Sequence, residues 1–192
     1  SAIAAGKHVV TANKALLALH GNEIFAAAHA RGVMVAFEGA VAGGIPIIKA
    51  LREGLTANRI EWIAGIINGT SNFILSTMRD TGASFDAVLA EAQKRGYAEA
   101  DPTFDVEGID AAHKLTIMAA IAFGVPMRFA AAYHEGITKL TREDIRYAEE
   151  LGYRIKLLGI TRRATVNGRE GIELRVHPTL IPEKRLIANV EG

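Results

Sequence analysis

Apolar residues recur along this chain with the two spacings that distinguish helices from strands. Where they return every three or four positions, one face of a helix is apolar and the opposite face is polar. This pattern predicts a helix that begins near Lys14, breaks at Gly21-Asn22 and resumes to Arg31, with Asn13 as its N-cap. Further helices are predicted over residues 46–54, 70–80, 85–95, 109–123 and 141–151, with Thr70 or Ser71, Ser84 and Thr141 as N-caps.

Short, continuous apolar runs predict the strands. The run 60–67 (IEWIAGII) is apolar on both faces, which is typical of a central strand. Because helices and strands alternate in the first half of the chain, the predicted fold class is α/β (α+β), with a mixed central sheet backed by helices. The other predicted strands are 8–11, 33–37, 155–161 and 171–177, the last two joined by a hairpin turn at Asn167-Gly168.

Composition narrows the classes of function. The 192 residues are 49% apolar, and 22 basic side chains nearly balance 21 acidic ones, for a formal charge of +1. The balanced charge means that the chain has no excess of basic residues of the kind that binds nucleic acid or an anionic membrane surface, so neither is an expected partner. The absence of cysteine excludes disulfides, thiolate zinc sites and cysteine nucleophiles. It is compatible with a reducing cytoplasm, where we expect the protein.

One stretch concentrates acidic residues beside an apolar helix. Within residues 96–117 (GYAEADPTFDVEGIDAAHKLTI), Lys114 follows the last acid, Asp110, by four positions. On a helix the two side chains share a face, and no further charged residue occurs up to Met127. They form either a solvated ion pair of about 0.3–0.5 kcal/mol or a partly desolvated pair. In the second case the lysine is placed to act as a proton donor.

The remaining acids of this stretch leave two interpretations open. Asp101 and Glu107 suit a solvated turn near the start of a helix. Several carboxylates near one lysine could also hold the ammonium group of a small, amino-acid-like substrate. Pattern alone does not separate these interpretations.

A glycine-rich loop, EGAVAGGIP at residues 38–46, lacks the G-x-G-x-x-G spacing of a dinucleotide fingerprint, which occurs nowhere in the chain. The loop is either a tight turn or a bend whose carbonyls, with Glu38, suit a cation bound by oxygens. Lys14, at a predicted strand-to-helix junction, is either a surface lysine or lies beside backbone N–H groups that could receive an anion or a polar cofactor edge. The histidines show no metal-ligand spacing.

Six segments together resemble the homoserine dehydrogenase family over nearly the whole chain. They are VVTANKALLA (9–18), EGAVAGGIPII (38–48), GIINGTSNFIL (65–75), GYAEADPTFDVEGIDAAHKL (96–115), HEGI from His134 and ELGYRIKLLG from Glu150. The fourth is long and specific. The resemblance implies reduction of L-aspartate 4-semialdehyde to L-homoserine with NADPH or NADH, on the route to threonine, methionine and isoleucine. It also implies a homodimer.

The resemblance assigns roles to individual residues of the substrate pocket. It implies that Lys114 protonates the carbonyl oxygen as hydride arrives. It implies that Asp110 and Glu99 hold the substrate, Glu99 at its amino group. The other residues that it places in this pocket are Asp105, Tyr97, Gly69 and Thr70.

The same resemblance implies a place for NADP or NAD and for a sodium ion. Lys14 would lie beside the nicotinamide and the substrate. Residues 1–36 would be the C-terminal remnant of a nucleotide-binding domain, and residues 37–192 the catalytic and dimerisation domain. The chain would then be an incomplete fragment, inactive alone. A structural sodium ion would be held by Glu38 and by the backbone oxygens of Val41, Gly43 and Ile45.

Two functions of other classes remain compatible with these residues. The chain could serve as a catalytically silent dimerisation module. Lys114 could instead form a Schiff base with a carbonyl substrate, as in a lyase or aldolase. A semialdehyde dehydrogenase that acylates a thiol is excluded, because the chain has no cysteine.

We expect the isolated 192-residue chain to bind NADPH weakly or not at all, because its sequence lacks the glycine-rich turn that cradles a pyrophosphate. Isothermal titration calorimetry of NADPH into the isolated chain checks this expectation. Tight, saturable binding would contradict it.

Overall fold

The computed structural model describes residues 1–191, so Gly192, the last residue of the predicted catalytic domain, lies outside the described residues. The fold is of the α/β class, with a two-stranded and a four-stranded sheet. Contacts within the chain divide it into two compact units, which are described separately. The first unit comprises Ser1–Ile63, His113–Ala132 and Thr161–Leu174, and the second comprises Ala64–Ala112, Tyr133–Ile160 and Arg175–Gly192.

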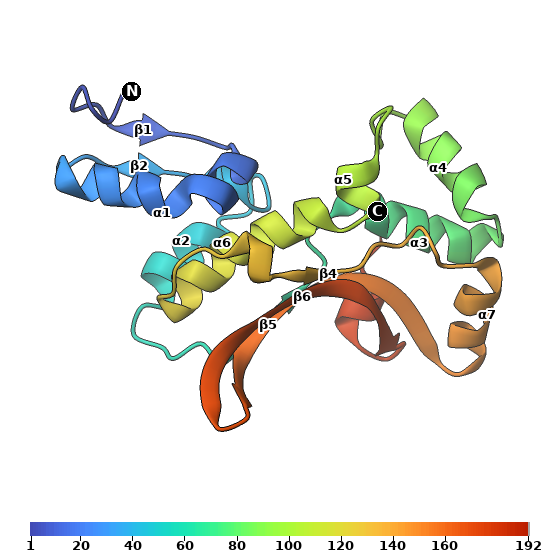
Figure 1. The fold of residues 1–192 in the computed structure, drawn as a ribbon. Helices are drawn as coiled ribbons and strands as arrows, with labels where there is room; N and C mark the ends of the chain where they lie inside the picture. Colours follow the sequence, from blue (N-terminus) through green and yellow to red (C-terminus); the bar gives the residue numbers. More distant parts are fainter. Residues whose placement is uncertain (192) are drawn as a thin grey trace. The chain divides into compact units, whose positions relative to one another are not determined.

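The first unit begins with a short parallel sheet and one long helix. β1 (Val9–Val10) pairs in parallel with β2 (Val35–Ala36), and α1 (Lys14–Ala30) connects the two strands (Figure 1). Asn13 caps α1, because its side-chain oxygen accepts a hydrogen bond of 3.0 Å from the backbone N–H of Leu16. Both predicted strands and the predicted cap are confirmed.

The predicted break at Gly21-Asn22 is wrong, because α1 continues through both residues. Gly21 is buried, and a Cβ atom there would lie 2.5 Å from the sulfur of Met127. The side-chain amide of Asn22 donates to the Met127 carbonyl and accepts from the Met127 N–H, both at 2.9 Å. These residues serve a tertiary contact rather than a helix end.

The loop after β2 leads into a short irregular helix. η1 (Glu38–Ala40) is a single 3₁₀ turn. Pro46 precedes α2 (Ile47–Lys49), which continues as the π-helical turn η2 (Ala50–Gly54). The predicted loop over 38–46 therefore contains one 3₁₀ turn, and the predicted helix over 46–54 is confirmed in extent.

In the second unit, α3 packs against α4, α5 and α7 (Figure 1). Ser84 caps α4, and Thr141 caps α7 through a reciprocal capping box with Asp144, as the sequence predicts for both caps. These helices are α3 (Gly69–Thr81), α4 (Phe85–Lys94), α5 (Thr103–Val106) and α7 (Arg142–Glu150).

The N-cap of α3 differs from the prediction. The cap is Asn68, whose backbone is extended and whose side-chain oxygen accepts from the backbone N–H of Ser71. Thr70 and Ser71 already lie within the first turn, so neither can be the cap.

The acidic stretch contains a short helix, α5, that its sequence did not predict. Gly108, with a φ of +78° in the left-handed region that favours glycine, separates α5 from α6 (Ile109–Phe123). The bounds of α6 are those predicted. Asp110 lies in the first turn of α6.

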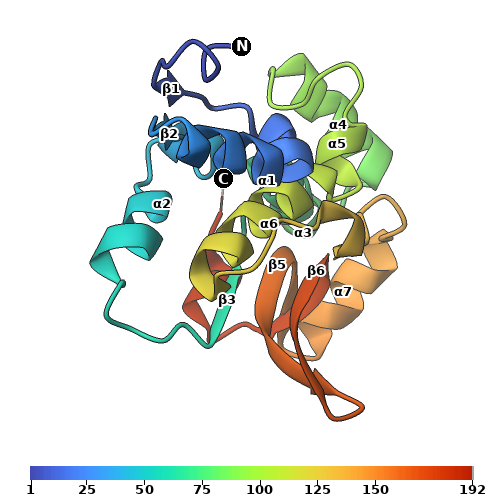
Figure 2. The same cartoon turned by 60° about the vertical axis from the view of Figure 1, so that its left-hand side comes forward.

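The long hairpin of the four-stranded sheet forms where Asn167-Gly168 predicts it. β5 (Tyr153–Val166) and β6 (Arg169–Pro182) are joined by this turn (Figure 2). Asn167 and Gly168 both have positive φ, 51° and 74°, which the favoured two-residue turns require.

The run 60–67 contains a strand, as predicted, but the predicted central position of that strand is wrong. The sheet order is β3-β5-β6-β4, so β3 (Trp62–Gly65) is an edge strand among the described residues and Trp62 is 65% exposed. The other edge is β4 (Tyr133–His134), which runs parallel to β6. Just after β3, Ile66 packs against the buried cluster of Leu158, Ile181 and Ala188.

Each unit has its own buried apolar residues. In the first they include Leu17, Val41 and Ile117, and in the second Ile74 and Val176. The short 3₁₀ turns η3 (Phe129–Ala131) and η4 (Leu186–Asn189) complete the described elements. No helix in the described part of the chain is long and apolar enough to cross a membrane.

Gly136 lets two segments of the second unit meet backbone to backbone. A Cβ atom at this position would clash with the Val106 carbonyl oxygen and lie 2.6 Å from the Cα of Glu107. Beside it, the Ile137 N–H donates to the Val106 carbonyl, and the Thr138 hydroxyl donates to the Glu107 carboxylate, each at 2.8 Å. The segment after β4 is thereby fastened to the end of α5.

We expect Gly136→Ala to destabilise this junction by about 1–3 kcal/mol, because the added methyl group overlaps backbone atoms that cannot swing aside. Hydrogen exchange of the Ile137 amide, measured in the complete protein that contains this chain, should accelerate about tenfold for each 1.4 kcal/mol lost. Gly171→Ala is the control, because nothing lies within 4 Å of a Cβ atom there. An Ile137 exchange rate unchanged by Gly136→Ala would contradict the expectation.

Candidate active site

Asn68 joins two of the predicted site carboxylates at the start of α3. Its Nδ2 donates to Asp105 Oδ1 at 2.7 Å and to Asp110 Oδ2 at 3.0 Å, while its Oδ1 accepts from the Ser71 N–H at 2.8 Å. Asn68 and Asp110 are each only 5% exposed, and Asp105 is half-buried. Two acids that the sequence placed in one loop and one helix therefore meet on a single amide group.

Local structure holds both aspartates in place. Asp105 belongs to α5, and its backbone carbonyl accepts a hydrogen bond of 2.9 Å from the Ser71 hydroxyl. Asp110 lies in the first turn of α6, where the positive end of the helix dipole favours a carboxylate. The first turn of α3 thus contacts the side chain and the backbone of Asp105.

An open cavity of about 470 Å³ lies in the same unit and is lined by Gly69, Thr70, Phe73, Arg95 and Tyr97. The Thr70 hydroxyl donates to the Tyr97 carbonyl at 2.9 Å, and the rings of Phe73 and Tyr97 meet edge to face, with centroids 5.0 Å apart. Three residues predicted for the substrate pocket, Gly69, Thr70 and Tyr97, therefore line one cavity. Its volume is within the range of small-molecule sites.

Glu99 and Lys114 lie in different surroundings. Glu99 is exposed, its backbone carbonyl accepts from the Gln93 side chain at 3.0 Å, and it is not among the described residues that line the cavity. Lys114 is half-buried on α6, one helical turn after Asp110 and on the same face. Lys114 belongs to the first unit and Glu99 to the second, so their predicted approach stays a prediction.

In the first unit, Lys14 is the first residue of α1 and follows the end of β1. Open α/β sheets bind ligands beyond the carboxyl ends of their parallel strands, next to the first turn of the following helix. Lys14 is half-buried at such a junction. This position fits the edge of a polar cofactor such as a nicotinamide nucleotide.

Glu38 lies at the N-terminus of α2. Its Oε1 accepts from the Ile48 N–H and its Oε2 from the Lys49 N–H, both at 2.9 Å. A carboxylate has about four lone-pair sites, so Glu38 keeps acceptor capacity for a cation beside these two bonds. Ala42 and Gly43 have φ values of 57° and 56°, so the predicted sodium loop curls between Glu38 and α2. Two backbone N–H groups thus fix the Glu38 carboxylate, and its remaining lone pairs are compatible with a bound cation.

Within residues 1–191, no group of three or more His, Cys, Asp or Glu residues could hold a metal ion.

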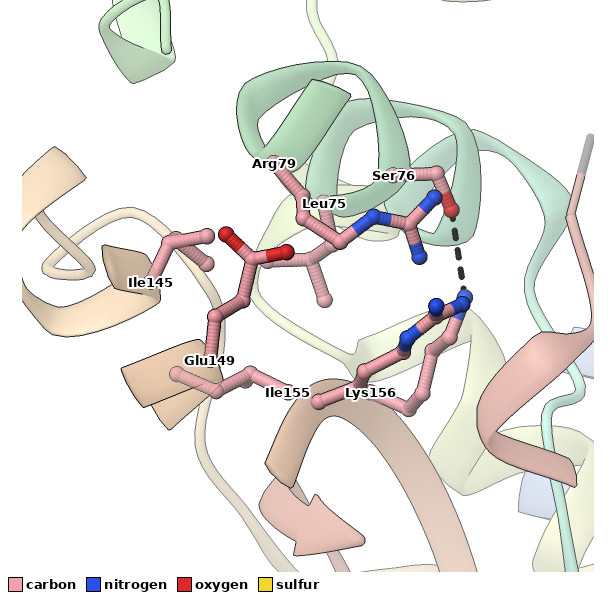
Figure 3. A pocket seen from close by; sticks show the side chains of 8 residues that line it. Leu75, Ser76, Arg79, Ile145, Glu149, Ile155 and Lys156 are labelled. Atoms are coloured by element: carbon pink, nitrogen blue, oxygen red, sulfur yellow. Dashed lines mark hydrogen bonds between the residues drawn. The ribbon is translucent and has the colours of Figure 1, made fainter. Parts of the chain in front are cut away.

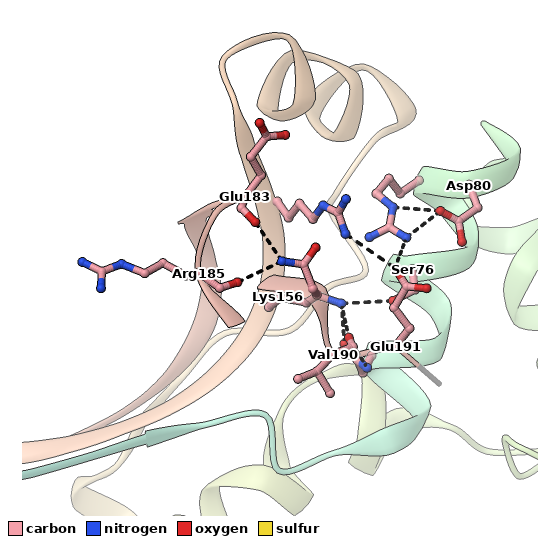
Figure 4. A network of polar contacts seen from close by, with 11 residues as sticks. Ser76, Asp80, Lys156, Glu183, Arg185, Val190 and Glu191 are labelled. Carbon is pink, nitrogen blue, oxygen red and sulfur yellow. Dashed lines mark hydrogen bonds and ion pairs between the residues drawn. The ribbon is translucent and has the colours of Figure 1, made fainter. Parts of the chain in front are cut away.

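A buried lysine that the sequence analysis did not single out lies in β5. Lys156 is 1% exposed, and its Nζ donates to Asn72 Oδ1 at 3.0 Å, Ser76 Oγ at 3.1 Å and the Val190 carbonyl at 2.6 Å (Figure 4). Burial, reinforced by the positive charge of Arg79 nearby, lowers the pKa of Lys156 to about 8. All three direct partners are neutral oxygen atoms.

This lysine attaches the segment after β6 rather than a ligand. Glu191 of that segment bonds to Arg79 at 2.6 Å and to Arg154 at 3.5 Å, on either side of the Lys156 contact with Val190. The pocket between α3, α7 and β5 that Lys156 borders has a volume of only about 10 Å³, room for about one water molecule (Figure 3). Lys156 is therefore a structural anchor.

The signals for the two missed residues differ. Asn68 precedes Gly-Thr-Ser at the start of a predicted helix, and asparagine is among the preferred N-caps. Its contacts with the aspartates, however, span 37 and 42 residues, beyond any local pattern. Lys156 interrupts an apolar strand, RIKLLG, but whether such a lysine is buried depends on partners from other elements.

The fold is that of an α/β protein with a parallel strand-helix-strand start and two carboxylates that meet on one buried amide. Residues 46–192 match the family model "Homoserine dehydrogenase", and residues 1–38 match the model "Homoserine dehydrogenase, NAD binding domain". The chain belongs to the homoserine dehydrogenase family.

Relatives and solved structures agree with this assignment. The chain is 72% identical over 191 residues to a homoserine dehydrogenase from Pseudomonas aeruginosa, covering 100% of this chain and 43% of that protein. It matches the crystal structure of a homoserine dehydrogenase from Thiobacillus denitrificans with a TM-score of 0.96 and 81% identity, over 100% of this chain and 43% of that one. The chain thus spans less than half the length of these relatives.

A more distant match carries a cofactor. A hyperthermophilic archaeal homoserine dehydrogenase in complex with NADPH matches with a TM-score of 0.81 and 28% identity, over 100% of this chain and 53% of that chain.

Lys156 should make the free energy of unfolding increase with pH in the alkaline range. Its pKa is near 8 when folded and 10.5 in an ordinary lysine, so between these values the unfolded chain binds more protons and stability rises with pH. Lys156→Met lacks this titration. We therefore expect the free energy of unfolding of the wild type, measured relative to that of Lys156→Met, to increase between pH 8 and 10.5 by on the order of 1–3 kcal/mol.

Urea denaturation of the complete protein at several pH values measures this difference. Lys139→Met is the matched control, because Lys139 is exposed in the same unit. A wild-type advantage over Lys156→Met that is constant across this pH range would show that the buried ammonium is not titrating as described.

Proposed function

We propose that the protein to which this chain belongs reduces L-aspartate 4-semialdehyde to L-homoserine, with NADPH or NADH as the hydride donor. The proposal is carried by one arrangement: Asp105 and Asp110 converge on Asn68, and Lys114 follows Asp110 by one helical turn. The substrate has an ammonium group near one end and an aldehyde at the other. Paired carboxylates and a separate ammonium group match these two ends.

In this mechanism the carboxylates orient the substrate. Asp110 and Asp105, with Glu99 at the amino group, bind the substrate ammonium and thereby direct its aldehyde. Gly69, Thr70 and Tyr97 form the wall of the cavity that receives it. Their common cavity of about 470 Å³ supports this assignment.

Lys114 serves the carbonyl oxygen. When hydride adds to the carbonyl carbon, negative charge develops on the oxygen. The Lys114 ammonium stabilises that charge and then neutralises it by transferring a proton. The apolar residues that follow Lys114 on α6 are buried, which keeps bulk water from one side of the amine.

A nicotinamide nucleotide supplies the hydride when bound. Lys14, at the junction of β1 and α1, would hold its edge. The match of residues 1–38 to a family model for an NAD-binding domain supports this role, as does the similarity to an archaeal relative in complex with NADPH.

We also propose a structural sodium ion, bound by Glu38 and by the carbonyl oxygens of Val41, Gly43 and Ile45. Oxygen ligands suit such a cation, and the curled loop between Glu38 and α2 supports the proposal. The ion would hold the loop in place and take no part in the chemistry.

The organisation of the whole protein follows from the same proposal. Residues 1–36 belong to its nucleotide-binding domain and residues 37–192 to its catalytic and dimerisation domain. Two copies form a homodimer, and the reaction takes place in the cytoplasm, which the absence of cysteine in this chain favours.

Replacing Lys114 should abolish most of the activity. We expect Lys114→Ala in the complete enzyme to lower kcat by about 10²–10⁴-fold, because the developing oxyanion loses its proton donor. The rate of NADPH oxidation with aspartate semialdehyde measures this, and circular dichroism checks that the fold is intact.

Lys94→Ala provides the control, because Lys94 is an exposed residue in the last turn of α4. Near-normal turnover of Lys114→Ala would mean that another group donates the proton. Trapping of a carbonyl substrate on wild-type Lys114 by borohydride would favour a Schiff-base enzyme instead.

A further inference from the structure

We propose that Asn68 is a positioning residue, which holds Asp105 and Asp110 together as one binding site for the substrate ammonium. This inference rests on the proposed function and adds to it a role for Asn68, to which the mechanism above assigns none. Asn68 would not touch the substrate. It would act through the two carboxylates that it fixes.

Three hydrogen bonds determine the orientation of the Asn68 amide. Its oxygen accepts from the Ser71 N–H at 2.8 Å, which leaves its nitrogen to face the aspartates. An amide nitrogen has two N–H groups, and the two acceptors, Asp105 Oδ1 at 2.7 Å and Asp110 Oδ2 at 3.0 Å, use both. If the amide were flipped, its oxygen would face the carboxylate oxygens and its nitrogen would face the Ser71 N–H. Both contacts would be repulsive, so the surroundings favour the observed orientation.

The neutral character of Asn68 matters for binding. Two carboxylates that converge on one point repel each other unless a donor lies between them. A lysine or arginine in this place would satisfy them but would also cancel the negative charge that attracts an ammonium group. An amide donates to both oxygens without adding a positive charge of its own.

The support beneath Asn68 is rigid. Asn68 is 5% exposed and begins α3, and the Ser71 hydroxyl of the same turn donates to the Asp105 carbonyl at 2.9 Å. The end of α5, one residue past Asp105, is fastened in turn by the bond from the Ile137 N–H to the Val106 carbonyl. The pair is thus held by backbone as well as by side chains, and binding needs little further ordering.

Two substitutions separate positioning from helix capping. Asn68→Ser keeps a hydroxyl oxygen that can cap α3 but loses both N–H donors to the aspartates. Asn68→Ala loses the cap and the donors together. If Asn68 served only α3, the serine variant would behave like wild type.

We expect Asn68→Ser in the complete enzyme to raise KM for aspartate semialdehyde by about tenfold to 100-fold, because the carboxylates lose their fixed geometry. KM for NADPH should stay within about twofold of wild type, since the cofactor does not depend on this pair. The melting temperature should stay near the wild-type value for Asn68→Ser and fall for Asn68→Ala. Calorimetric titration of L-homoserine should show the same loss of affinity in both variants without any turnover.

Asn58→Ser is the matched control, because Asn58 is exposed and lies outside the predicted site. Wild-type KM for the semialdehyde and wild-type affinity for L-homoserine in Asn68→Ser would overturn the inference and leave the proposed function standing. An equal rise in both KM values would also overturn it, since that result indicates general damage. A wild-type enzyme that does not reduce the semialdehyde would refute the proposed function, and this inference with it.

Discussion

The hydrogen bonds of one buried amide organise the candidate site. Asn68 caps α3 through its oxygen and draws Asp105 and Asp110 together through its nitrogen, so the start of a helix and the geometry of two carboxylates depend on the same side chain. Because these bonds are short and largely shielded from water, they are stronger than the same contacts at a surface. The two aspartates come from different elements, α5 and the first turn of α6, and both bond to this amide.

At two places in the second unit, neutral groups form hydrogen bonds with charged side chains that are buried or half-buried. Asn68 supplies neutral donors to two carboxylates, and Asn72, Ser76 and Val190 supply neutral acceptors to the ammonium of Lys156. The groups that form these hydrogen bonds with the charged side chains are neutral at both places. At Lys156 the hydrogen bond to the Val190 carbonyl attaches the segment after β6, and burial lowers the pKa of the lysine.

Side-chain contacts between distant segments accompany two failures of the sequence-based prediction. Gly21 was predicted as a helix break, yet α1 passes through it, because a residue without Cβ leaves space for Met127. The run 60–67 was predicted as a central strand, yet β3 lies at an edge of the described sheet, and the neighbouring Ile66 packs into a cluster with Leu158 and Ile181. In both cases the residue type was explained by a partner far away in the chain, which composition and periodicity do not reveal.

The sequence by itself determined the features that arise within a few residues: the bounds of α6, the Ser84 and Thr141 caps, the hairpin at Asn167-Gly168 and the family motifs. It also placed Gly69, Thr70 and Tyr97 in one pocket by resemblance, and the structure brings all three to one cavity. Only the tertiary structure decided that Asp105 and Asp110 share Asn68 and that Lys156 is buried. The physical reason is range: helical periodicity and capping act over one or two turns, whereas these contacts join residues at least 34 positions apart, which only packing brings together.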